Sequence, residues 1–369
     1  MGLLDDILHG VLMEVAAKQP DLSEQQWTEI AEKTVVESFP QIAETLWHSL
    51  QETKEENLFL SRLELEMFTK RNIFRWREGF DLMDMLGEIS LEIGQIVNRD
   101  DEPGERPSVG CRHRALVRLH AKARQIYSEI VCLLKHGFAD GALGRWRALH
   151  EVAVVSSLLS VHDEDLAKRF LEFRWVESWK SMKVYQEKAE KLGLDPFSPE
   201  AFERARQCYQ EMLKRYGEKF RGNYGWAASV VQPARGAEIT FRDIERAVGT
   251  DHLKPYYQWA CQKIHVGCNT LHNSLGLSEA QSEQVMMAGP SNAGHCDPAH
   301  LAAISLHTAT CTLTSLSTSM DVLVGCKITE MLVAKIGDAF LKAHKQLEQE
   351  EEELQRQAHP AAERVEGEP

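Results

Sequence analysis

Apolar residues recur along most of this chain at the three- and four-residue spacing of amphipathic helices. The clearest example is residues 111–136, where the apolar residues on one face are Leu116, Leu119, Ala123, Ile126, Ile130 and Leu134. No convincing run of alternating β-branched residues interrupts this pattern. The sequence therefore predicts an all-α fold, built as a bundle of several helices.

Capping and breaking residues predict where the helices begin and end. Ser23 is an expected N-cap, because Gln26 three residues later completes a capping box. Thr240 or Asp243 is expected near the cap of a short helix. The predicted helices are 3–18, several long ones from 23 to about 97, 111–136, 144–161, 163–193, 198–219, a short one within 238–249, one within 252–276, and two after a loop at 287–300.

One stretch is predicted to link two helical regions. The segment "NRDDEPGERPSVG", residues 98–110, is rich in charge and contains two prolines and two glycines. The expected organisation is a helical N-terminal region at 1–98, a linker at 99–110, a helical domain at 111–345, and an acidic tail at 346–369 that begins as a solvated helix end and then becomes disordered.

Composition favours a globular protein in the cytoplasm. Hydrophobic residues make up 43% of the chain, which is enough for a core, yet no run approaches the ~18 apolar residues of a membrane span. The N-terminal segment lacks the basic region and cleavage site of a signal peptide. The eight cysteines include no CxxC pair, so we expect them to be mostly reduced and buried.

The net charge of −14 argues against a nucleic-acid partner at first sight, but the charge is unevenly distributed. Residues 106–150 carry nine bases and two acids, and no acid occurs between 106 and 128. Arg114, Arg118 and Lys122 recur every four residues and form a stripe on the predicted helix. Such a stripe is often only a solvated helix face, but its lack of acids predicts a phosphate-binding surface, with RNA as the candidate partner.

The segment "GRWRALHE", residues 144–151, contains the strongest candidates for catalysis. Arg145 and His150 form an R-x4-H arrangement, and Arg147 and Glu151 have the spacing of an ion pair on one helix face. A neutral imidazole can move the proton of an RNA 2′-hydroxyl or of the leaving oxygen, and an arginine can stabilise the charge that develops on phosphorus. The non-catalytic alternative is that Arg145 is solvated and that Arg147 and Glu151 form a structural ion pair.

The segment "CQKIHVGCNTLH" places Cys261, His265, Cys268 and His272 on one stripe if it is a single helix. One helix cannot surround a tetrahedral metal ion, so a metal site would need ligands from elsewhere. The candidates for these further ligands are His295, Cys296, Asp297 and His300 in the "GHCDPAH" segment. The alternative is that the cysteines pack and one histidine faces a cleft.

Three blocks of this sequence resemble the domain-of-unknown-function 5677 family, over roughly residues 110–325. The blocks are "HAKARQIYSEIVCLLKHGFADGALGRWRALHE", "YYQWACQKIHVGCNTL" and "GPSNAGHCDPAHLAAISL". The positions that match are Arg147, Glu151 and His265. The family is also similar to HEPN-type helical domains, which occur in metal-independent ribonucleases with an R-x4-6-H motif. The resemblance implies a homodimer and two alternative sites, Arg145 with His150, or Arg147 and Glu151 with His265.

The leading prediction is a metal-independent endoribonuclease or toxin-like effector, acting in defence or stress and needing no cofactor. One alternative is a non-catalytic helical module that binds a protein, nucleic acid or small ligand, with the N-terminal region as the surface for a regulatory protein partner. The other alternative is a metal-dependent hydrolase that uses His265, His272, His295 and Asp297.

Overall fold

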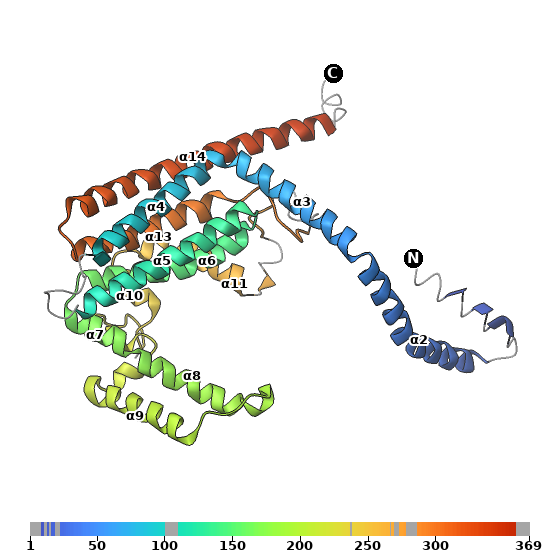
Figure 1. Cartoon of the computed structure of the whole chain (residues 1–369), viewed down its shortest axis with the longest axis horizontal. Helices are drawn as coiled ribbons and strands as arrows, with labels where there is room; N and C mark the ends of the chain where they lie inside the picture. The colour runs from blue at the N-terminus through green and yellow to red at the C-terminus, as the bar shows by residue number, and fades with distance from the viewer. Residues whose placement is uncertain are drawn as a thin grey trace, which may run out of the picture. The chain divides into compact units, whose positions relative to one another are not determined.

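The computed structural model describes residues 9–10, 13–14, 16–18, 23–99, 110–236, 238–265, 267–268, 273–277 and 286–358. Over these residues the chain forms α-helices and short 3-10 helices without any strand, so the predicted all-α fold is confirmed (Figure 1). None of the described helices is both long and apolar enough to pass through a bilayer.

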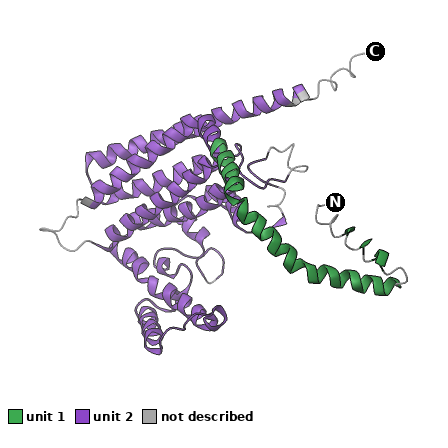
Figure 2. Ribbon diagram, turned by 45° about the vertical axis from the view of Figure 1, so that its right-hand side comes forward, with its two compact units in different colours: residues 1–68 green, residues 69–369 purple. Residues whose placement is uncertain are grey.

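The chain divides into two compact units, residues 1–68 and residues 69–369 (Figure 2). The first unit contains α2 (Glu24–Glu52) and most of α3 (Lys54–Arg75). The predicted N-cap is confirmed, because Ser23 and Gln26 form a reciprocal capping box at the start of α2. Helix α2 buries none of its residues and leaves Phe39 and Trp47 exposed. This unit therefore has little apolar core in the described residues.

The second unit is a bundle whose central helices are α4 (Arg77–Arg99), α5 (Cys111–Lys135), α6 (Ala139–Ser160), α13 (Cys296–Cys311) and α14 (Met320–Ala358). Trp76, Phe80 and Met83 lie in the core that α5, α6, α13 and α14 share. The division between the two units, after Phe68, thus falls earlier in the chain than the predicted end of the N-terminal region at residue 98. The stretch 99–110 connects two helices of one bundle, α4 and α5, rather than two domains.

Helices α5 and α6 form the tight hairpin that carries most of the candidate residues. The break between them is only residues 136–138, shorter than the predicted 136–144. Gly137 adopts a positive φ of 81°, which lets the chain reverse sharply, and the Phe138 amide donates to the Leu133 carbonyl at 2.9 Å. Because α6 begins at Ala139, the "GRWRALHE" segment lies well inside the helix, where it packs against neighbours on several sides.

The predicted helix over 163–193 is two helices, α7 (Glu164–Glu172) and α8 (Arg174–Lys188). The division falls at Phe173, whose buried ring contacts Phe220 edge to face. Helix α8 packs beside α9 (Pro199–Tyr216), and the two form a projecting hairpin (Figure 1). The residues between α9 and α10 form short 3-10 turns, η2 (Glu218–Arg221) and η3 (Gly225–Ala227).

Helix α10 (Phe241–Ala247) begins as predicted, with Thr240 and Asp243 both part of its capping box. Helix α11 (Lys254–Ile264) ends earlier than the predicted 252–276, because His265 adopts an extended backbone with φ −103° and ψ 132°. Cys261 and His265 therefore do not continue one helical stripe to Cys268, and His272 lies outside the described residues. The next residues in the sequence, the β-branched Val266 and then Gly267, are poor helix formers, which accounts for the early end.

The C-terminal helix extends into the acidic segment. Residues 346–358 continue α14, as expected for a solvated helix end, and residues 359–369, where disorder was expected, lie outside the described residues. Leu347 is buried in the core, and Arg75 pairs with Glu350 at 2.6 Å. These two contacts attach the first turns of the acidic segment to the bundle.

Candidate functional site

Arg147, Glu151 and Tyr257 meet where α6 packs against α11. The Arg147 Nη2 atom lies 2.9 Å from Glu151 Oε1, which confirms the predicted ion pair. The Arg147 Nε–H donates to the Tyr257 hydroxyl at 2.8 Å, and that hydroxyl donates to Glu151 Oε1 at 2.5 Å. The guanidinium also lies over the Tyr257 ring, 5.2 Å from its centroid. The three side chains therefore form a closed, charge-assisted network.

The charges in this network stabilise each other. Burial opposes the charge of Arg147, but the hydrogen bond to Tyr257 and the Glu151 carboxylate outweigh it and raise the Arg147 pKa. Burial and the hydrogen bond to Glu151 raise the pKa of Tyr257 well above its usual value, against the effect of Arg147. At neutral pH the site thus presents a cationic guanidinium and a protonated phenol beside a carboxyl group.

The network borders an open groove of about 440 Å³. Charged side chains that line the groove are Arg145, Arg147, Glu151 and Lys263, so cations outnumber acids three to one. Lys263 comes from the last turn of α11 and pairs with Asp140 at 2.8 Å. The Arg147 and Glu151 side chains are 31% and 33% exposed, so a ligand in the groove can reach both.

Arg145 and His150 do not meet. Arg145 pairs with Glu129 of α5 at the edge of the groove. His150 is only 2% exposed and donates from Nε2 to Glu245 Oε1 at 2.9 Å. Its ring lies against Trp146, Phe241 and Tyr257. In this structure the R-x4-H pair is a surface arginine and a core histidine, and among the described residues His150 contacts the candidate site through the Tyr257 ring.

Replacing Glu245 with Ala is expected to destabilise the second unit by about 2–3 kcal/mol, because it leaves the buried His150 nitrogen without its acceptor. Urea unfolding of the two proteins measures the difference. The matched control is Glu218→Ala, which removes an exposed pair with Arg221 at 3.7 Å and should cost less than about 0.5 kcal/mol. Equal losses of unfolding free energy in the two variants would mean that the buried His150–Glu245 bond stabilises the unit no more than the exposed pair does.

His265 lies outside the network. It is exposed at the C-terminal end of α11, and among the described residues no hydrogen bond or ion pair joins it to Arg147 or Glu151. Tyr257, two turns earlier on α11, holds the place that was predicted for His265. Sequence reasoning missed both Tyr257 and Lys263, although Tyr257 belongs to the block "YYQWACQKIHVGCNTL".

The basic stripe lies where it was predicted, on the exposed face of α5. Arg114, Arg118 and Lys122 are all exposed. Arg114 contacts the Cys111 sulfur at 3.2 Å, and Lys122 donates to Gln125 at 3.1 Å, so neither of these bonds neutralises its charge. By helical periodicity the same face continues to Glu129, the partner of Arg145. The stripe therefore leads along α5 towards the groove.

The candidate metal ligands are not gathered into one site. His295 is buried, stacked on Trp76 at 4.9 Å, and its Nδ1 lies 2.9 Å from the Ala293 carbonyl. Burial lowers its pKa to about 4, so it is neutral at physiological pH. Over the described residues, no three or more His, Cys, Asp or Glu side chains are grouped as metal ligands. His295 instead anchors the "GHCDPAH" segment to the core.

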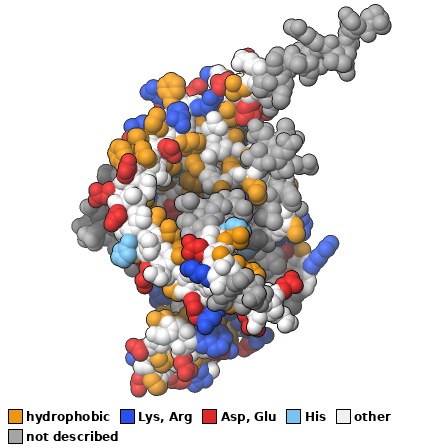
Figure 3. Space-filling model, turned by 90° about the vertical axis from the view of Figure 1, so that its right-hand side faces the viewer, with side chains coloured by type: hydrophobic (Ala, Val, Ile, Leu, Met, Phe, Trp, Pro, Cys, Tyr) orange, Lys and Arg blue, Asp and Glu red, His pale blue; other side chains and the backbone are white. Residues whose placement is uncertain are grey.

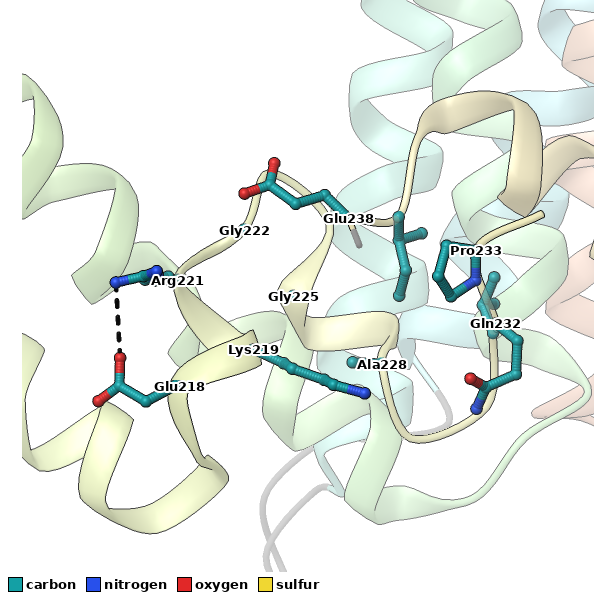
Figure 4. A pocket seen from close by; sticks show the side chains of 11 residues that line it. Glu218, Lys219, Arg221, Gly222, Gly225, Ala228, Gln232, Pro233 and Glu238 are labelled. Carbon is teal, nitrogen blue, oxygen red and sulfur yellow. Dashed lines mark ion pairs between the residues drawn. The ribbon is translucent and has the colours of Figure 1, made fainter. Parts of the chain in front are cut away.

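Another hollow lies away from this network, between η2, η3 and residues 231–239 (Figure 4). It encloses about 240 Å³, and Lys219 extends along it while Arg221 pairs with Glu218. None of the predicted catalytic or phosphate-binding residues lines it.

Acidic and basic side chains are mixed over the face seen in Figure 3. The local grouping of charge around the groove is therefore more informative than the net charge of the chain.

Residues 113–283 match the model of a family of unknown function, DUF5677, and this segment belongs to that family, as its sequence predicted. The matched segment contains α6, α11, α5 except its first two residues, and all three residues of the network. No curated protein and no solved structure matches the chain. The similarity to HEPN-type domains stays a prediction.

Proposed function

We propose that this DUF5677 member is a metal-independent endoribonuclease whose active site is the Arg147–Glu151–Tyr257 network. The observation that carries the proposal is the geometry of that network. A carboxylate, a guanidinium and a protonated phenol lie within hydrogen-bond distance of one another at the edge of an open groove. These three groups supply the base, the positive charge and the acid that phosphodiester transfer needs.

Each residue has one role in the proposed reaction. Glu151 removes the proton of the 2′-hydroxyl, and the resulting oxygen attacks the neighbouring phosphorus. Arg147 stabilises the charge that grows on the non-bridging oxygens. Tyr257 gives its proton to the departing 5′-oxygen, and its raised pKa keeps it protonated until that step. The products are a 2′,3′-cyclic phosphate and a 5′-hydroxyl.

Cations around the network support a polyanionic substrate. Arg145 and Lys263 line the same groove as Arg147. The exposed residues of the α5 stripe recur every four positions, which places them about 6 Å apart along the helix. In the proposed complex these side chains hold phosphates on either side of the cleaved bond. The setting in defence or stress, a homodimer and a protein partner at the N-terminal region remain predictions.

A non-catalytic binding module is the second candidate. It is favoured by one observation, that Arg147, Glu151 and Tyr257 already satisfy each other without a ligand and tie α6 to α11. In that case the groove binds a ligand but performs no chemistry, and substitutions change affinity or stability alone.

The experiment that separates these candidates is incubation of the purified protein with an unstructured RNA in excess EDTA. The proposed ribonuclease should cut the RNA and leave cyclic phosphate ends, while DNA of the same sequence stays intact because it lacks the attacking 2′-hydroxyl. Cleavage that EDTA abolishes would favour the metal-dependent hydrolase. Binding of the RNA without any cleavage, with or without added Mg²⁺, would favour the binding module.

A further inference from the structure

A second hollow adjoins the groove along α6. It encloses about 680 Å³, within the usual range of ligand sites, and its walls come from α6, α7, α8 and the turn at 222–227. Glu151 lines both the groove and this hollow, and Val155, one turn further along α6, lines the hollow alone. The two spaces therefore meet at a residue of the proposed active site.

The walls of the hollow are aromatic. Phe170 and Tyr224 are half-buried, so parts of their rings face the open space. Trp226 packs edge to face against Phe170 at 5.0 Å and is itself buried. Polar side chains at the hollow are Glu177, Lys180, Ser181 and Asn223, and all four are exposed. A flat ring with hydrogen-bonding edges would find an aromatic surface and adaptable polar partners there.

Tyr224 lies close to the proposed catalytic groups. Burial raises its pKa to about 12, and the Glu151 carboxylate adds to this rise while Arg147 opposes it. Among the described residues its hydroxyl makes no hydrogen bond with a side chain or backbone group. Unlike Tyr257, Tyr224 is therefore not committed to the network and is free to contact a ligand.

The groove and the hollow differ in the charged residues that line them. Three cations and one acid line the groove, whereas Glu151, Glu177 and a single cation, Lys180, line the hollow. Although Glu129 and Asp140 pair with Arg145 and Lys263, the groove offers a phosphate three cationic donors, whereas acids outnumber the one cation in the hollow and disfavour a phosphate there. The uncharged part of a nucleotide, its base, meets no such repulsion.

We propose that the hollow is a nucleobase subsite, in which one base of the RNA stacks on Tyr224 while the adjoining phosphate lies in the groove beside Arg147. The inference rests on the proposed ribonuclease function and extends it to base recognition next to the cleaved bond. It predicts that cleavage depends on the presence of a base at one position relative to the scissile phosphate.

The test is equilibrium binding of a trinucleotide without 2′-hydroxyls, which cannot be cleaved, compared with three versions that each lack one base. Calorimetry with the full chain should show that one abasic version binds about tenfold more weakly, because stacking of one base contributes that order of affinity. Tyr224→Leu should bind the intact trinucleotide about tenfold more weakly and should show no further loss with that abasic version.

Two variants serve as controls. Tyr224→Phe keeps the ring and should bind like the unaltered chain, while Tyr256→Leu removes an exposed tyrosine that does not line the hollow and should have no effect. Unfolding midpoints of all variants identify any that have lost structure. If all abasic versions bind alike, or if the abasic loss persists undiminished in Tyr224→Leu, the subsite is rejected.

The outcome is independent of whether the chain cuts RNA. Base-dependent binding that Tyr224→Leu removes, in a protein that never cleaves RNA, would establish the subsite and reject the ribonuclease. EDTA-resistant cleavage with the same rate at abasic and normal positions would keep the ribonuclease and reject the subsite.

Discussion

Replacing Glu151 with Gln is expected to lower kcat/KM for RNA cleavage about 10²–10⁴-fold, the range for loss of a general base. Arg147→Ala should lower kcat/KM for RNA cleavage at least about 10²-fold, because it removes the charge that stabilises the transition state. Neither change should lower the free energy of unfolding by more than about 1 kcal/mol, since the pair is about one-third exposed and stability from such pairs is small. Single-turnover cleavage and urea unfolding measure the two effects separately.

The control variants are Glu203→Gln and Arg206→Ala, which alter an ion pair of i, i+3 spacing on the surface of α9. These variants should cleave RNA at the unaltered rate. His265→Ala should also retain activity, since His265 makes no contact with the network among the described residues. A large loss in His265→Ala together with full activity in Glu151→Gln would overturn the assignment of the base.

His150→Ala distinguishes the network from the R-x4-H alternative. If His150 is a buried structural residue, the His150→Ala variant should lose both stability and activity, because the imidazole ring packs against Tyr257 and Trp146. Loss of activity at unchanged stability would instead mean that His150 takes a direct part in the reaction, which would require it to leave Glu245.

The Arg147–Glu151 pair was predictable because it is local. Residues four apart on a helix are neighbours whatever the rest of the chain does, and the ion pair follows from spacing alone. Tyr257 lies 110 residues from Arg147 in the sequence, and only the packing of α11 on α6 brings its hydroxyl to the guanidinium. No periodicity within one segment contains that information.

His150 shows what helical spacing alone does not predict, namely the burial of a side chain. Spacing predicts its angle from Arg145 around the helix, about 140°. Spacing does not predict how deeply each face is buried. Twelve of the 22 residues of α6 are buried, since α5, α11 and α13 all pack on it. His150 is one of these buried residues, and its Nε2 lies 2.9 Å from Glu245 Oε1 of α10. An R-x4-H motif on a central helix therefore does not imply two accessible side chains.

The predicted stripe through His265 depended on a helix that would continue past Ile264. Helix ends are set by a few residues, and here the chain becomes extended at His265 itself. The predicted domain boundary had a similar weakness. Prolines, glycines and charges identify a loop at 98–110, but such a loop can join two helices of one bundle as readily as two domains.

A chain that begins at residue 111, where the predicted helical domain starts, is expected not to fold cooperatively, whereas a chain that begins at Thr69 should unfold like the second unit of the full protein. Removal of residues 69–110 takes away Trp76, Phe80, Met83 and Leu86, each at most 1% exposed. Burial of such side chains contributes about 1.5–3 kcal/mol each, so the loss is comparable with the whole stability of a typical domain, about 5–15 kcal/mol.

Thermal unfolding followed by circular dichroism compares the two shortened chains. The milder variant Trp76→Ala in the full chain tests the same core without removing a helix. It should cost about 3–5 kcal/mol, because the indole stacks on both His295 and Phe340 and its deletion leaves a cavity between them. A cooperative transition for the chain from 111, at the same temperature as for the chain from Thr69, would show that α4 is dispensable. The linker would then mark a true domain boundary.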